Sequence, residues 1–192
     1  MKSYLRTFLL AASLFVCHVN AQDNAQEHAE GFLCCNMRTD GSWISDINYA
    51  TEGMKIIPVG TPVKVTEYGR YRAYVEIGGG KQGLGNDYSR DLTMDTFVAR
   101  YVLKADPRLQ IATFPLRIQA AIAAARLTPG MTREQVMMSV GIPVSSENAD
   151  LKAKIWRYWL NSDDEFQVVF DDAGRLAEIS AEPSTLSVVV LP

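Results

Sequence analysis

The chain has 192 residues, of which 47% are hydrophobic and 21% are charged, and its formal net charge is -3. This balance is typical of a globular protein and excludes a disordered or fibrous chain. A mildly acidic chain without a basic cluster is not expected to bind nucleic acid. No stretch after residue 21 has the roughly 20 consecutive apolar residues of a transmembrane helix, so we expect no such segment there.

The first 21 residues have the three parts of a secretory signal peptide. Lys2 and Arg6 form a basic start, residues 8–16 form a short apolar run, and residues 19–21 form a small-residue cleavage site. We therefore expect cleavage near Ala21 and a periplasmic or secreted location for the rest of the chain.

Cys17 raises the alternative of a lipoprotein signal, in which an acylated cysteine would hold the protein peripherally at the outer membrane. Such signals normally place Gly, Ala or Ser directly before the cysteine, whereas this chain has Val16. The bulky side chain of Val16 argues against lipidation and favours simple cleavage.

Residues 22–30 are polar, and we interpret them as a flexible lead. Residues 31–106 predict a small β-barrel, because short alternating segments are separated by turn residues, among them the hairpin signal Asp40-Gly41. Phe97 and Tyr101 lie four residues apart, which predicts a closing helix. The expected strands are residues 32–37, 42–47, 63–66, 71–77 and 82–88, and the expected helix is 93–103.

Asp106-Pro107 marks a boundary, because the residue before a proline leaves the helical region. Residues 107–192 predict a second domain that begins with a helix. Its expected apolar face, at helical spacing, consists of Leu116, Ile118, Ala121, Ile122 and Ala125.

A second, short helix is specified by local signals at both of its ends. Thr132 is a good N-cap and Gln135 stands three residues later, which predicts a capping box. Gly141 followed by Pro143 predicts the stop. A helix of about two turns is not stable alone, so it needs a partner surface.

The expected partner surface is an antiparallel sheet of residues 155–160, 166–170 and 176–179, with a hairpin at 171–175. Trp156 and Phe170 are among the side chains that would bury two helices on one face. Residues 186–191 predict a further strand, which the sequence assigns neither to this sheet nor to the barrel. The fold class is therefore α+β, with a small β-barrel followed by two helices packed on an antiparallel sheet.

Four motifs in this order resemble the BamE (SmpA/OmlA) family of bacterial envelope proteins. They are Leu127-x-Pro-Gly-Met-Thr132, Gly141-Ile-Pro143, Trp156-Arg-Tyr158 and Phe166-x-Val-x-Phe-Asp-Asp-x-Gly-Arg175. The resemblance implies two helices against a three-stranded antiparallel sheet. The best-known members of this family are lipoproteins of the outer-membrane β-barrel assembly machinery, so the resemblance also implies a role in outer-membrane assembly or maintenance. Residues 59–77 resemble bacterial SH3-like domains, which implies an SH3-like barrel for the first half.

The residues that usually carry catalysis or bind metals are scarce. After residue 21 the only histidine is His28, in the polar lead, so no Ser-His-Asp triad and no usual zinc site is expected. The glycines of 78–85 are interpreted as turn residues, and the acidic residues of 163–165 and 171–172 as exposed hairpin ends. We expect a protein that is not an enzyme and has no cofactor.

Cys34 and Cys35 are adjacent, which leaves three alternatives open. They can form a vicinal disulfide, pair with another chain, or alternate along a strand as buried thiols. A structural role is preferred over a redox role.

The expected function is protein–protein interaction with an envelope partner. Alternation along residues 155–160 places Ile155, Arg157 and Trp159 on the face away from the helices, and an outward Trp beside an Arg is typical of binding hot spots. One alternative is cell-wall glycan or peptide binding in a groove around Tyr68, Tyr71 and Tyr74, and another is an enzyme inhibitor that uses its sheet face.

Overall fold

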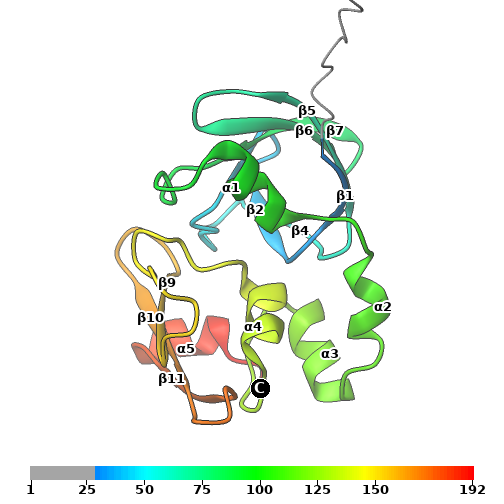
Figure 1. Cartoon of the computed structure of the whole chain (residues 1–192). Helices are drawn as coiled ribbons and strands as arrows, with labels where there is room; N and C mark the ends of the chain where they lie inside the picture. Colours follow the sequence, from blue (N-terminus) through cyan, green and yellow to red (C-terminus); the bar gives the residue numbers. More distant parts are fainter. Residues whose placement is uncertain (1–28) are drawn as a thin grey trace, which may run out of the picture.

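The computed structural model describes residues 29–192, in which five helices and three β-sheets form a mixed α+β fold (Figure 1). The expected signal peptide, Cys17, His28 and most of the lead lie outside the described residues. The described chain begins inside the barrel, because the Ala29 carbonyl accepts from Val65 N and Glu30 already pairs with Lys64.

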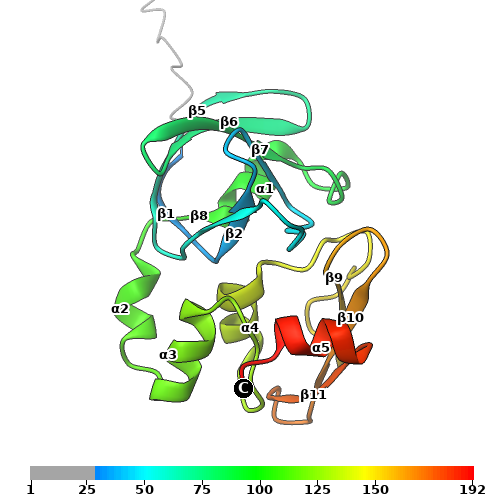
Figure 2. The same cartoon turned by 180° about the vertical axis from the view of Figure 1, so that it is seen from behind.

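A curled six-stranded sheet forms a half-barrel in the first half of the chain (Figure 2). Its order is β3-β7-β6-β5-β1-β8, and every pair is antiparallel except β3 with β7. The strands are β1 (Glu30–Leu33), β3 (Trp43–Ser45), β5 (Pro62–Tyr68), β6 (Arg72–Ile77), β7 (Gly80–Gly85) and β8 (Val102–Leu103). Helix α1 (Met94–Tyr101), with Thr93 as its N-cap, buries Phe97 and Tyr101 in the core of this half-barrel.

The expected hairpin at Asp40-Gly41 exists only as a turn. The Asp40 carboxylate accepts from the backbone N–H groups of Ser42 and Trp43, and Gly41 has a φ of 104°. The flanking strands do not pair with each other, because β2 (Met37–Thr39) pairs with β4 (Lys55–Ile57) while β3 pairs with β7. The turn is therefore local, and the strand partners are set by tertiary packing.

Two helices connect the half-barrel to the second half. The short helix α2 (Pro107–Ile111) has Asp106 as N-cap and Pro107 at its first position, which is a favourable helix start. The sequence indicated Asp106-Pro107 only as a boundary and did not predict this helix. Helix α3 (Leu116–Ala123) buries Ile118, Ala121 and Ile122 as expected. Leu116 was wrongly assigned to the buried face, because it stands in the first turn, beyond the contact with α4, and is 82% exposed.

Helix α4 (Arg133–Val140) has the ends that the sequence predicts. Thr132 N donates to Gln135 Oε1 at 2.9 Å, and Gln135 N donates to Thr132 Oγ1 at 3.2 Å, so the capping box is complete. Gly141 stops the helix with a φ of 96°. Met131 and Val136 are both fully buried beside the start of the helix.

The second sheet has the order β11-β10-β9 and is antiparallel throughout. It consists of β9 (Ile155–Trp159), β10 (Glu165–Phe170) and β11 (Leu176–Ser180). Trp156, Tyr158, Phe166, Val168 and Phe170 are all buried in one core with α3 and α4. The predicted sheet and its inward side chains are therefore confirmed.

The expected strand at residues 186–191 is wrong, because helix α5 (Pro183–Val189) occupies most of it. Pro183 stands at the first helical position, and Thr185 and Val189 are buried, so packing outweighs the β-preference of the valine run. Only Val190 makes a strand-like bridge, to Leu127. Figures 1 and 2 show α4 and α5 on the same side of the three-stranded sheet.

The two halves are joined by two buried asparagine amides. Asn36 Nδ2 donates to Ile122 O at 2.6 Å and to Ser139 O at 3.0 Å, and Asn36 Oδ1 accepts from Val59 N at 2.9 Å. The half-barrel is thus tied to both α3 and α4 through backbone groups that a buried site must satisfy.

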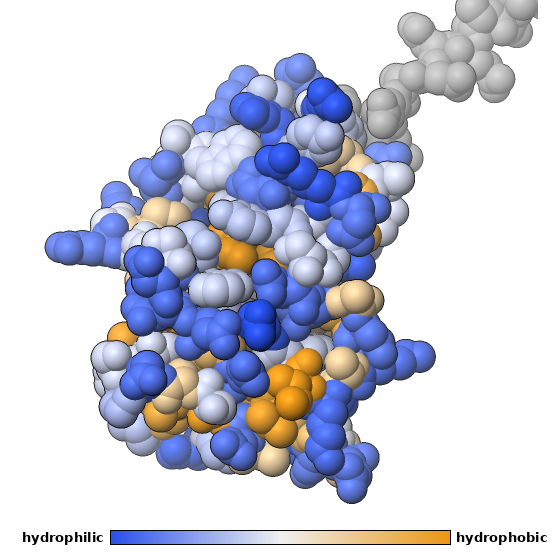
Figure 3. All heavy atoms as spheres, turned by 90° about the vertical axis from the view of Figure 1, so that its left-hand side faces the viewer, coloured by the Kyte–Doolittle hydropathy of each residue, from blue (hydrophilic) through white to orange (hydrophobic). Residues whose placement is uncertain are grey.

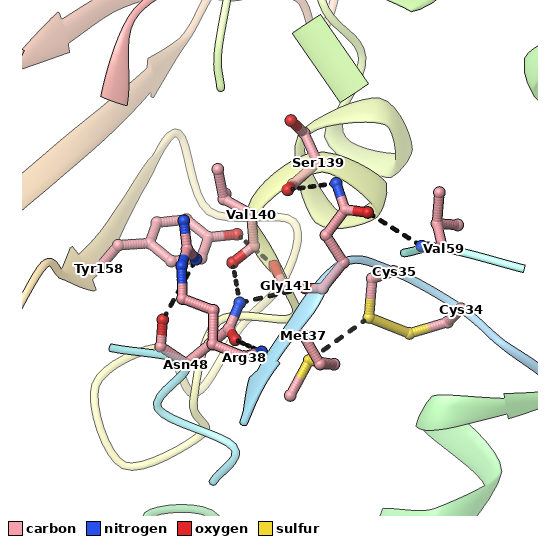
Figure 4. Close-up of a disulfide and its surroundings, with 11 residues drawn as sticks. Cys34, Cys35, Met37, Arg38, Asn48, Val59, Ser139, Val140, Gly141 and Tyr158 are labelled. Carbon is pink, nitrogen blue, oxygen red and sulfur yellow. Dashed lines mark hydrogen bonds between the residues drawn. A yellow bond between two sulfur atoms is a disulfide. The ribbon is translucent and has the colours of Figure 1, made fainter. Parts of the chain in front are cut away.

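Asn48 makes a similar set of hydrogen bonds at the C-terminal end of α4 (Figure 4). Its Nδ2 donates to Asn36 O at 3.1 Å and to Val140 O at 2.8 Å, while its Oδ1 accepts from Arg38 N at 2.7 Å. A Cβ added to Gly141 would lie 2.8 Å from Asn48 Nδ2, so this close approach also requires glycine.

Cys34 and Cys35 form a vicinal disulfide at the same junction (Figure 4). Cys35 is fully buried, and its sulfur lies 3.9 Å from Met37 Sδ. Of the three alternatives open from the sequence, the structure has the intrachain bridge. Its burial in the core of the half-barrel is in keeping with a structural role.

Removing the cap of α4 and disrupting its buried face should have unequal effects. We expect Thr132→Ala to lower the free energy of unfolding by about 1 kcal/mol through the lost hydrogen bond. Val136→Asp should cost at least about twice as much, because it buries an unpaired charge against the sheet. Urea denaturation measures both, and equal small losses would contradict the packing described here.

Replacing the Asn36 amide should destabilise the fold, because this one side chain satisfies three buried backbone groups. Asn36→Ala leaves Val59 N, Ile122 O and Ser139 O without their partner, at about 1–3 kcal/mol for each buried group. Asn36→Asp keeps the shape but points a carboxylate at two carbonyl oxygens, so we expect it to be the worse of the two. Chemical denaturation tests the order, and a loss below about 1 kcal/mol for both variants would show that the junction does not depend on this amide.

Candidate functional site

The outer face of the three-stranded sheet carries the side chains that alternation predicts. Trp156 and Tyr158 point into the core, whereas Ile155, Arg157 and Trp159 lie on the other face. Ile155 is 51% exposed and Trp159 is half-buried. The half-barrel docks on α3 and α4 through Asn36 and Asn48 and reaches the end of this strand, where Ala50 N donates to Leu160 O at 2.8 Å, but it leaves Ile155 exposed.

Figure 3 views the molecule from the side on which this sheet lies. Apolar side chains gather in its lower part, over the C-terminal half, and the upper part is mainly polar. Val169 lies directly opposite Ile155 across the β9–β10 pair and is half-buried, so the two side chains form a small apolar centre.

Arg157 is not a free cation on this face. Its guanidinium makes ion pairs with Glu147 at 3.3 Å and with Glu165 at 3.2 Å. The open edge of β9 is also closed at this residue, since Asn148 Nδ2 donates to Arg157 O and Asn148 Oδ1 accepts from Arg157 N. The sequence indicated the orientation of Arg157 but not its acidic partners, which come from outside β9.

The three tyrosines of the alternative groove do not share one face. A register shift between Val65 and Glu67 turns Tyr68 inward, where it pairs with the buried Ala73. Tyr74 points outward from the neighbouring position, and Tyr71 lies between the guanidinium groups of Arg70 and Arg90 at 5.0 and 4.8 Å. The structure therefore separates Tyr68 from Tyr74, and burial raises the pKa of the Tyr68 hydroxyl.

Two of the glycines in 78–85 have a role that the turn interpretation missed. Gly78 and Gly79 do form the turn, with φ values of 60° and 80°. Gly83 and Gly85 instead leave room for the Trp43 ring. A Cβ would lie 2.6 Å from that ring at Gly83 and 2.2 Å from it at Gly85. The Trp43 Nε1–H group donates to Asp87 Oδ2 at 3.1 Å.

A pocket of about 550 Å³ opens beside Asp87, between the loop that follows β3 and the loop that follows β7. We call it the Arg38 pocket. Its walls include Tyr49, Tyr88, Arg90 and Asp87, with Arg38 and Asn48 reaching it from the junction of the two halves. No motif in the sequence indicated this pocket, because its lining comes from three separate stretches of chain.

Asp46 holds one wall of the Arg38 pocket in place. Its carboxylate is completely buried and accepts from the backbone N–H groups of Asp87 and Tyr88, each at 3.1 Å. Burial, which outweighs these hydrogen bonds, raises the pKa of Asp46 to about 6.

Within residues 29–192, no group of three His, Cys, Asp or Glu side chains is arranged to hold a metal ion. None of the helices in this part of the chain combines the length and the apolar character needed to cross a membrane.

No family model, curated protein or solved structure matches the chain.

The buried carboxyl of Asp46 should link stability to pH. Because its folded pKa of about 6 lies above the ordinary 3.8, the folded protein binds this proton more tightly than the unfolded chain. The resulting stabilisation is complete below pH 3.8 and is lost as pH rises through about 6. Between about pH 4 and pH 7 we expect the free energy of unfolding of the original chain to decrease by on the order of 3 kcal/mol because of this group. Asp46→Asn should remove that decrease.

Urea unfolding of both proteins across this pH range measures the difference. If the free energy of unfolding changes with pH equally in the original chain and in Asp46→Asn, another group is responsible for the pH dependence.

Proposed function

We propose that the chain is a non-catalytic protein of the bacterial envelope that binds a protein partner through the outer face of its C-terminal sheet. The observation that carries this proposal is the open position of that face. Ile155 is 51% exposed although a whole second half of the same chain is available to cover it. The half-barrel docks on α3 and α4 and reaches the sheet at Leu160, whose carbonyl accepts from Ala50 N, but it leaves Ile155 exposed.

The chemistry of the face suits a protein surface better than a charged ligand. The charge of Arg157 is already neutralised by ion pairs with Glu147 and Glu165. Ile155, with Val169 opposite it, supplies an apolar anchor inside a polar rim, which is the usual anatomy of a protein–protein interface.

The proposed setting is the periplasm, with the partner in outer-membrane assembly or maintenance. The basis is the resemblance of residues 127–175 to the BamE family, together with the predicted signal peptide. The β11-β10-β9 order and the position of α3 and α4 in one core with this sheet support a BamE-like second half. The curled sheet closed by α1 supports an SH3-like first half. Helices α2 and α5 are additional elements that neither resemblance implies.

Ile155→Ser should separate partner binding from folding. The side chain is half exposed, so we expect little change in melting temperature, and at least a tenfold loss of partner capture because the apolar anchor is gone. The measurement is crosslinking and quantitative mass spectrometry of envelope extract bound to the purified chain, compared with the unaltered protein.

Leu116→Ser is the matched control for this experiment. Leu116 is an even more exposed leucine, at 82%, but it lies on α3 and not on the sheet. Capture should survive in this variant. Unchanged capture by Ile155→Ser, or an equal loss in Leu116→Ser, would place binding elsewhere and contradict the proposal.

A further inference from the structure

The Arg38 pocket contains a cation, Arg38, that has no carboxylate within ion-pair distance among the described residues. Arg38 is half-buried, and its guanidinium donates one long hydrogen bond of 3.4 Å, from Nη1 to Asn48 O. Among residues 29–192 it makes no ion pair, whereas Arg157 and Arg108 each have carboxylate partners. Burial lowers the pKa of Arg38, in keeping with a charge that has lost water without gaining a counterion.

A guanidinium has five N–H donors in a planar fork that fits a carboxylate or a phosphate, so most of the donors of Arg38 remain available. Arg90 adds a second positive charge at the wall of the pocket. Its guanidinium lies 4.8 Å from the Tyr71 ring. The two arginines outnumber Asp87, the carboxylate that also lines the pocket, and so favour an oxyanion inside it.

The remaining lining is suited to a ring that carries hydroxyl groups. Tyr49 and Tyr88 form an aromatic wall, with ring centroids 6.5 Å apart. Burial, with the neighbouring Tyr88 hydroxyl as a second cause, raises the pKa of Tyr49 to about 12. Asp87 supplies an acceptor, and its carboxylate is held by Trp43 and by Ser45 Oγ at 2.6 Å.

We propose that the Arg38 pocket binds a small hydroxylated ring that carries an oxyanion, such as a sugar acid or a sugar phosphate. Arg38 binds the oxyanion, the tyrosine wall contacts the ring, and Asp87 accepts from ring hydroxyls. The volume of about 550 Å³ lies within the usual range for small-molecule sites. This site is separate from the outer sheet face and does not depend on the protein partner.

Three probes that share one ring distinguish the sources of the anion. Glucose is neutral, glucuronate carries a carboxylate, and glucose 6-phosphate carries a phosphate. We expect at least one of the two anions to bind the purified chain about tenfold more tightly than glucose, as measured by calorimetry or by chemical shift changes. Binding of one anion alone identifies the carboxylate or the phosphate as the preferred group.

Arg38→Gln should abolish this preference while leaving any weak binding of glucose unchanged, and Arg38→Lys should restore part of it. Arg175→Gln is the matched control, because Arg175 Nη1 also donates one long bond of 3.3 Å to a backbone carbonyl, but far from the pocket. Tyr88→Ala, at an exposed position, should weaken binding of all three probes and covers the case in which Arg38→Gln does not fold.

Two results would overturn the proposal. One is that neither anion binds better than glucose. The other is that Arg38→Gln, folded as judged by its melting temperature, keeps the anion preference at the level of Arg175→Gln.

Discussion

A buried amide needs partners for its oxygen and for both of its N–H hydrogens, and Asn36 and Asn48 obtain all of theirs where the two halves meet. Three of their four acceptors are carbonyls on α3 and α4, so these bonds fix where the half-barrel meets the two helices. Docking there leaves the outer face of the second sheet open, and it brings Arg38 to the wall of a pocket. Both proposed binding sites are therefore consequences of the same few hydrogen bonds.

The parts of the fold that could be predicted are those whose causes are local in sequence. Helix α4 is specified by Thr132, Gln135 and Gly141, and β9 to β11 by alternation and one hairpin. The errors arise where distant contacts decide. The strands on either side of Asp40-Gly41 take partners elsewhere in the chain, and the valine run of α5 becomes helical because Val189 is buried in the second core.

The candidate site divides in the same way. Period-two alternation was enough to place Ile155, Arg157 and Trp159 on one face. Alternation does not predict the separation of Tyr68 from Tyr74, because one irregular register step in β5 reverses the direction of the side chains that follow. The Arg38 pocket had no sequence signal, since its residues come from three separate stretches of chain. The charge of Arg38 is significant only because, among the described residues, no carboxylate lies within ion-pair distance of it.

The contact between Leu127 and the segment after α5 has a consequence for how the chain matures. Leu127 N donates to Val189 O, and Leu191 N donates to Leu127 O, so the second core is closed by residues more than sixty positions downstream. This half cannot complete its packing until residue 191 reaches Leu127. The half-barrel, complete by β8, can fold much earlier, and its Asn36 and Asn48 amides then face water until α4 arrives to satisfy them.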